Sequence, residues 1–172
     1  SHSAEKSTLE TIELSERPIA ITHANPSFFH AALRNKSDAV IRAIGESEGM
    51  LGFSMYPFHL KNGSDCTLEE FCQMIGQTVE IIGIDRVGIG SDLCLNWDYK
   101  VLEWMRSGRW TTGVDHGEGS AEKPAWPDQP SWFSGTKDLS IVAKGLEEQG
   151  FSDDNIAKVM GENWLSFFEK SF

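Results

Sequence analysis

The stretch from Pro18 to Asn25 constrains the fold more than any other part of the chain. Small and β-branched apolar residues lead into His23, and Pro26 begins the loop that follows. Such a run predicts a short buried strand that ends in a polar side chain. Parallel α/β folds place their chemistry at the carboxyl ends of strands. His23 is therefore either a ligand or catalytic residue at such an edge, or a loop histidine with local hydrogen bonds.

Two more segments follow the same plan, because residues 50–56 and 87–92 are short apolar runs and the second of them ends in Asp92. Amphipathic segments separate and follow the three strands. Capping boxes at Ser7–Glu10 and Thr67–Glu70 indicate where two helices begin. Helices are expected over 8–15, 37–49, 67–83, 139–148 and 152–160, and again after Gly161. This alternation predicts an α/β fold with a parallel sheet flanked by helices.

Three parallel strands with both faces covered correspond to about half of a (β/α)8 TIM barrel, since a whole barrel takes ~250 residues. The chain has 172 residues, which is enough for one core and one domain. Residues 1–172 are therefore expected to form part of a single barrel domain.

Residues 93–136 break the alternation. Five of the six tryptophans fall in or beside this segment, with several prolines and glycines: Trp97, Trp104, Trp110, Trp126 and Trp132. The composition predicts a long, packed, Trp-rich loop after the last strand. A lid, a cover for the core and a dimer contact are all compatible with it.

Charge and cysteine content limit the classes of partner and the cellular location that are expected. The net charge is −11, from 26 acidic and 15 basic residues, and no basic stripe is visible, so nucleic acid is not an expected partner. No apolar run approaches the ~20 residues of a membrane span, and membrane contact is not expected. Three cysteines without a CxxC pair favour a reducing compartment, hence a cytoplasmic location, and argue against a cysteine zinc site.

Several polar motifs occur in a specific order. His2 precedes His23 by 21 residues, Arg34-Asn35 begins 11 residues later, and Gly90-Ser91-Asp92 ends the third strand. Gly161-Glu162-Asn163 precedes the last helix. In this order and spacing, the chain resembles the carboxyl-terminal half of the membrane (renal) dipeptidase family, zinc dipeptidases of the amidohydrolase superfamily. The resemblance covers residues 1 to about 92 and resumes near 139–168.

The resemblance implies an enzyme that hydrolyses dipeptides at a two-zinc site and forms a homodimer. His2 and His23 look like two of the metal ligands, and Asp92 looks like the carboxylate that handles the proton of the attacking water. Arg34 looks like the clamp for the substrate carboxylate, and Tyr56 is expected to line the pocket. The family's other ligands, a His-x-Asp and a bridging Glu, have no counterpart in these 172 residues.

Simpler interpretations of the same residues stay open. Arg34 could be a surface charge and Tyr56 a packing residue, while His2 could be a tag remnant, although its spacing from His23 favours a native residue. The remaining histidines, His30, His59 and His116, are expected to be solvated loop residues. At the level of function, the alternatives are a non-catalytic half-barrel that binds or scaffolds, and a sister amidohydrolase that acts on another amide.

Overall fold

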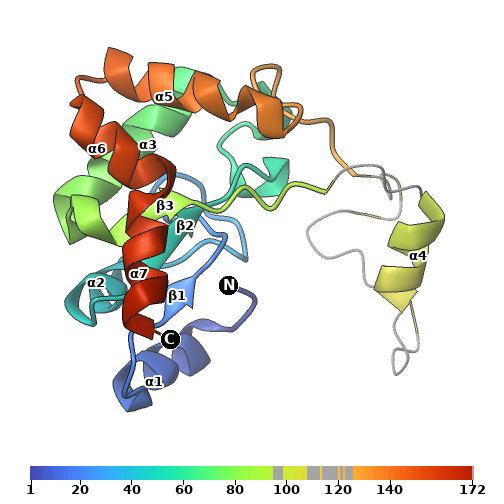
Figure 1. Cartoon of the computed structure of the whole chain (residues 1–172). Helices are drawn as coiled ribbons and strands as arrows, with labels where there is room; N and C mark the ends of the chain where they lie inside the picture. Colours follow the sequence, from blue (N-terminus) through green and yellow to red (C-terminus); the bar gives the residue numbers. More distant parts are fainter. Residues whose placement is uncertain (95–98, 108–112, 114–119, 121, 123–125, 172) are drawn as a thin grey trace.

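The computed structural model of the chain describes residues 1–94, 99–107, 113, 120, 122 and 126–171. A three-stranded sheet of order β1-β2-β3 lies at its centre (Figure 1). The strands are β1 (Ala20–Ile21), β2 (Met50–Phe53) and β3 (Val87–Ile89). Both pairs are parallel, so the predicted α/β sheet is confirmed. The regular strands are shorter than expected, but backbone hydrogen bonds such as Ala24 N–H to Gly52 O continue the ladder beyond them.

Helices connect and cover the strands. The α-helices are α1 (Glu5–Leu14), α2 (Asp38–Glu46), α3 (Leu68–Ile82), α4 (Tyr99–Ser107), α5 (Leu139–Glu148), α6 (Asp153–Ala157) and α7 (Asn163–Ser171). Short 3-10 turns are η1 (Pro57–His59), η2 (Gly63–Asp65), η3 (Ile84–Arg86) and η4 (Thr136–Asp138), and η5 (Lys158–Glu162) is a π-helical turn. Helices α1, α2, α3 and α5 pack in series, each against the next, while α7 crosses in front of the strands in Figure 1.

Local sequence sets two of the helix starts as expected. The Ser37 hydroxyl caps α2, and Thr67 and Glu70 form both hydrogen bonds of a capping box at the start of α3. The capping box predicted at Ser7 is wrong, because α1 begins at Glu5 and has no side-chain cap. The favourable helix formers at positions 5 and 6 extend that helix upstream, so the Ser7 position lies inside it.

The core lies between the sheet and the series of helices. Leu51 and Phe53 of β2 and Val87 of β3 are fully buried there, with Ile41, Ile44, Phe71 and Ile75 of the helices. The opposite face of the sheet carries glycines. A Cβ atom at Gly52 would lie 2.1 Å from the carbonyl oxygen of Thr22 and 2.9 Å from the Trp164 ring. The crowding that the strand glycines predicted is confirmed, because the Thr22 backbone and the Trp164 side chain lie directly against this face.

The crowding yields a prediction for a pair of glycine substitutions. Gly52→Ala is expected to lower the free energy of unfolding by about 1–3 kcal/mol or more, since the atom that it meets is backbone and cannot turn aside. Gly76→Ala is the matched control, because the nearest neighbour of its Cβ would be the Phe151 ring at 3.8 Å. In the middle of α3, alanine is expected to stabilise by about 0.5–1 kcal/mol. Urea unfolding measures both, and equal effects of the two changes would contradict the crowding.

The segment after β3 is only partly a loop. Helix α4 lies within it, which the expectation of an unbroken loop missed, and it lies apart from the sheet in Figure 1. Trp104 of α4 is exposed, whereas the indole of Trp132 packs on Phe71 and donates to the Cys66 carbonyl at 2.8 Å. Trp97 and Trp110 lie outside the described residues.

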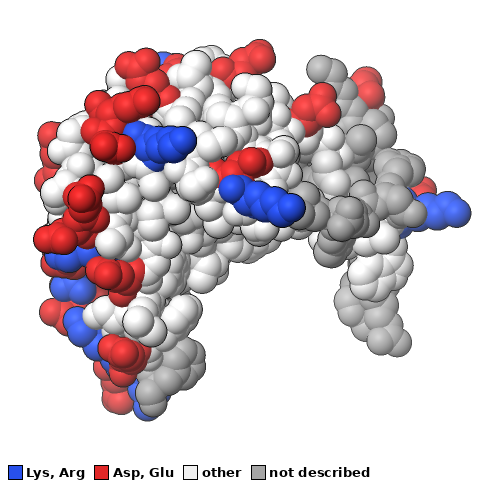
Figure 2. Space-filling model, turned by 45° about the horizontal axis from the view of Figure 1, so that its top comes forward, with Lys and Arg blue, Asp and Glu red and all other residues white. Residues whose placement is uncertain are grey.

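Acidic side chains predominate along the left edge of the surface in Figure 2, with Lys and Arg between them. Among the helices that the structure describes, none is long and apolar enough to cross a membrane.

Candidate metal and substrate site

The polar residues predicted from the strand ends gather at the carboxyl edge of the sheet. His23 lies two residues beyond β1, and Asp92 lies three residues beyond β3. Asp92 adopts a left-handed backbone conformation with φ 56°, which a non-glycine residue adopts at some cost. The backbone therefore turns at the position of the candidate catalytic side chain, shortly after the strand has ended.

His2, His23 and Asp92 lie together. The Nε2 atoms of His2 and His23 are 2.9 Å apart, and the two rings meet edge to face. Asp92 Oδ1 lies 3.9 Å from His23 Nε2. One nitrogen from each ring and one carboxylate oxygen therefore point toward a common region at the edge of the sheet.

Thr22 orients the His23 ring. Its Oγ1 lies 2.9 Å from His23 Nδ1, on the side of the ring away from His2. When Nδ1 carries the proton and donates to this hydroxyl, Nε2 keeps its lone pair toward His2. Metal-binding histidines are commonly held in this way by a partner on the second nitrogen.

Electrostatics favours neutral imidazoles at this edge. Burial is the main cause that lowers the pKa of His2, and the charge of Arg34 adds to it. Burial also lowers the pKa of His23, against the opposing influence of the Asp92 carboxylate. Since a metal ion binds the unprotonated ring, both shifts suit ligand histidines.

The two candidate substrate residues come from neighbouring loops. Arg34 lies half-buried in the loop after β1, close enough for its charge to lower the pKa of His2, His23 and Lys36. Tyr56 follows β2 and makes edge-to-face contacts with the His59 and Trp126 rings, with centroids 5.1 and 5.4 Å apart.

His59 corrects the sequence interpretation, because its side chain is buried and not solvated. Its exposed fraction is 2 %, and its Nδ1 lies 2.8 Å from the Ser54 hydroxyl. Sequence reasoning also missed the buried amides of Asn25 and Asn35. The available signal was their position, since Asn25 follows His23 by two residues and Asn35 is adjacent to Arg34. His30 is half-buried, and His116 lies outside the described residues.

The described residues do not complete a metal site by themselves. Among them, no group of three or more His, Cys, Asp or Glu side chains could hold a metal ion. Burial raises the pKa of the Cys66 and Cys72 thiols to about 12, so neither provides a thiolate ligand. The donor set at the edge therefore consists of two imidazoles with a carboxylate beside them.

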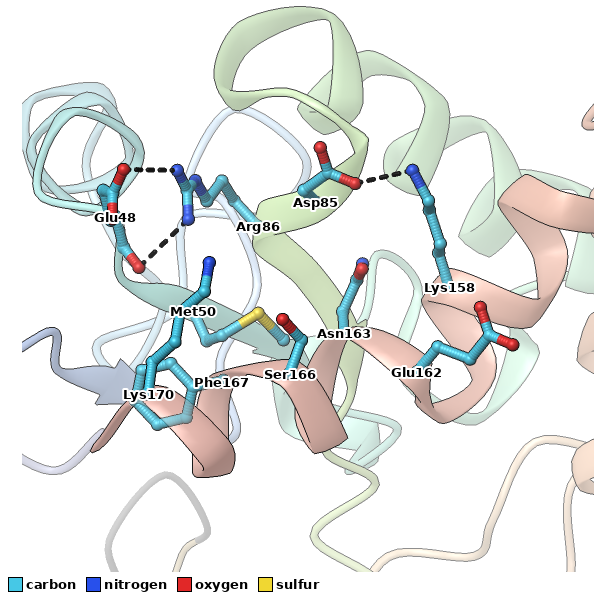
Figure 3. Close-up of a pocket in the computed structure, with 10 residues that line it drawn as sticks. All are labelled: Glu48, Met50, Asp85, Arg86, Lys158, Glu162, Asn163, Ser166, Phe167 and Lys170. Carbon is cyan, nitrogen blue, oxygen red and sulfur yellow. Dashed lines mark hydrogen bonds and ion pairs between the residues drawn. The ribbon is translucent and has the colours of Figure 1, made fainter. Parts of the chain in front are cut away.

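A cavity of about 290 Å³ lies at the other end of the sheet, where Met50 begins β2 and Arg86 precedes β3. Figure 3 shows two ion pairs among its lining residues, Arg86 with Glu48 and Lys158 with Asp85. The amino-terminal end of a parallel sheet is usually concerned with stability, and the cavity lies far from the histidine pair along the strands.

Comparisons with known proteins agree with the overall fold. An amidohydrolase from Pseudomonas aeruginosa superposes with a TM-score of 0.84 at 27% identity, over 99% of this chain and 51% of its own. A metallo peptidase from Rhodobacter sphaeroides, liganded with a phosphinate mimic of the dipeptide L-Ala-D-Ala, superposes with a TM-score of 0.75 at 22% identity, over 100% of this chain and 41% of its own.

A sequence relative and a family model are more specific. Dipeptidase tcpJ of Claviceps purpurea (strain 20.1) is 22% identical over 167 residues, which are 95% of this chain and 32% of that protein. This chain thus spans about a third of that relative and about half of the Pseudomonas structure. The parallel sheet with flanking helices places it among the α/β proteins. Within that class it belongs to the membrane dipeptidase family (Peptidase family M19), whose model matches residues 1–101.

Proposed function

We propose that the protein containing this chain is a zinc-dependent dipeptidase, and that residues 1–172 form the carboxyl-terminal half of its (β/α)8 barrel. The observation that carries the proposal is the 2.9 Å approach of the His2 and His23 nitrogens at the same edge of the sheet as Asp92. Family membership and the dipeptide mimic bound to the Rhodobacter relative support the choice of substrate.

The two histidines fit a shared metal ion. Two nitrogens at about 2.0–2.1 Å from one tetrahedral zinc ion are roughly 3.3 Å apart, close to the separation of the two Nε2 atoms. Zinc, when bound, polarises a substrate carbonyl and lowers the pKa of water. His2 and His23 would hold it in their neutral forms, with Thr22 fixing the second ring. Further ligands come from sequence outside these 172 residues.

Asp92 serves proton transfer in this proposal. Its carboxylate lies beside the histidine pair and not between the two nitrogens, so it is free to accept the proton of the attacking water. The same oxygen then donates that proton to the amine nitrogen of the leaving amino acid, which completes cleavage of the peptide bond.

Arg34 binds the carboxylate of the dipeptide, for which the planar guanidinium offers two parallel donors. Tyr56 lines the pocket from the neighbouring loop. The expectations of a homodimer and of a cytoplasmic location stay predictions.

The test is to measure metal content and turnover after removal of one ligand. The protein is purified with the sequence that naturally flanks this chain. His23→Ala is expected to weaken zinc affinity by more than roughly 10- to 100-fold, which is the usual loss when a residue that only hydrogen-bonds to a metal ligand is removed. Hydrolysis of a simple dipeptide is expected to fall with it.

His30→Ala is the control, because that side chain comes from the loop after β1 and takes no part in the histidine pair. It is expected to retain zinc and turnover. Full zinc occupancy in His23→Ala would contradict the ligand role. If the unmodified protein hydrolyses another amide but no dipeptide, the result would instead favour a sister amidohydrolase.

A further inference from the structure

Two buried asparagines close the loop that carries Arg34. The Asn25 backbone N–H donates to Asn35 Oδ1 at 3.0 Å, and the Lys36 N–H donates to the Asn25 carbonyl at 2.8 Å. The Asn35 side chain also donates to the His30 carbonyl at 2.8 Å. Residues 25–36 thus form a closed loop whose two ends are joined by an amide side chain.

The same two side chains tie this loop to the one after β2. Asn25 Nδ2 donates to the Ser54 and His59 carbonyls at 2.9 and 3.1 Å, and its Oδ1 accepts from the Ser54 N–H at 3.0 Å. Asn35 Nδ2 donates to the His59 carbonyl at 2.9 Å. The His59 carbonyl therefore accepts a hydrogen bond from both asparagine side chains. Tyr56 lies within the loop after β2 that these hydrogen bonds hold in place.

We propose that Asn25 and Asn35 are positioning residues that lock the Arg34 loop against the Tyr56 loop and so hold Arg34 at a fixed distance from the histidine pair. The inference rests on the function proposed above for Arg34. Neither asparagine reaches the candidate site, because both side chains are buried and form hydrogen bonds with backbone groups in the interior.

The physical reason is the short path from amide to guanidinium. Arg34 directly precedes Asn35 in the chain, so a shift of the Asn35 backbone moves Arg34 with it. The two amides are nearly inaccessible to water, at 0 and 8 % exposure, and water cannot replace the lost donors without opening the loop. A displacement of about 1 Å in a substrate-positioning group can cost roughly 100-fold in rate.

The test compares Asn35→Ala, which removes three side-chain hydrogen bonds, with the loss of two side-chain hydrogen bonds of another buried asparagine. Asn163 is buried at the opposite end of the sheet, and its side chain donates to the Ile84 and Val87 carbonyls at 2.7 and 2.8 Å. In the purified protein with its natural flanking sequence, both variants are expected to lower Tm. Only Asn35→Ala is expected to lower kcat/KM for a dipeptide, by about 10- to 100-fold.

A double-mutant cycle separates positioning from general destabilisation. In an Arg34→Ala background, Asn35→Ala is expected to lower kcat/KM by less than about threefold, because the residue that Asn35 positions is already gone. Effects that multiply in full, or an equal loss of kcat/KM in Asn163→Ala, would overturn the proposal.

Amide hydrogen exchange keeps the inference testable if the protein hydrolyses no dipeptide and the proposed function fails. Asn35→Ala is then expected to speed exchange across residues 24–36, while Asn163→Ala leaves that loop unchanged. Unchanged exchange in the loop of Asn35→Ala would show that the asparagines do not restrain it.

Discussion

Asp92→Asn is expected to lower kcat for dipeptide hydrolysis by about 10²- to 10⁴-fold, the range that a positioned acid or base contributes. Asparagine has nearly the same volume and tolerates the left-handed backbone found at this position, so the fold should persist. It cannot accept and return the proton of the attacking water. Zinc content should stay near that of the unmodified protein, since the two imidazoles are untouched. Steady-state kinetics and metal analysis on one preparation measure both.

Asp85→Asn supplies the matched control for Asp92→Asn. Asp85 pairs with Lys158 at 2.7 Å at the other end of the sheet, and its side chain is largely exposed. Loss of this ion pair is expected to leave kcat within about twofold of the unmodified protein. A kcat for Asp92→Asn within tenfold of the unmodified value would remove Asp92 from the proton transfer, whatever its effect on stability.

Much of the fold could be predicted because its signals are local. An apolar run predicted each strand, and the Thr67–Glu70 capping box fixed the start of α3. The meeting of His23 and Asp92 followed from a rule of topology, because the carboxyl ends of parallel strands share one edge. His2, which follows no strand of the described chain, was expected beside them only from the resemblance to a family. Their chemical roles did not follow from that rule and came from the resemblance to a family.

The rest depended on contacts that no local pattern encodes. His59 reads as a solvated histidine in a polar loop, yet tertiary packing buries it and turns Nδ1 to Ser54. Asn25 and Asn35 are of a residue type that is common in turns. Only the fold shows that their side-chain amides form hydrogen bonds between two loops. Likewise, α1 begins ahead of the Ser7 signal because helix propensity at its start outweighs one capping side chain.

Arg34→Ala is expected to lower kcat/KM for dipeptides by roughly 30- to 1,000-fold, as loss of a charged hydrogen-bond partner in a partly desolvated site costs about 2–4 kcal/mol. Arg34→Lys should lose less, because lysine keeps the charge but not the two parallel donors. Zinc content should not change, since a guanidinium is no zinc ligand. Arg42→Ala, which removes an exposed arginine of α2, is the control and should leave kcat/KM unaltered.

Amidation of the substrate tests whether the Arg34 guanidinium contacts the carboxylate itself. A dipeptide whose carboxyl end is amidated should be a poor substrate of the unmodified protein. It should be almost equally poor for Arg34→Ala, because the mutation and the amidation remove the same contact. If the two changes each lower kcat/KM and their effects simply multiply, the guanidinium binds elsewhere. The carboxylate clamp would then have to be sought on another loop of the same edge, with the histidine pair and Asp92 keeping their roles.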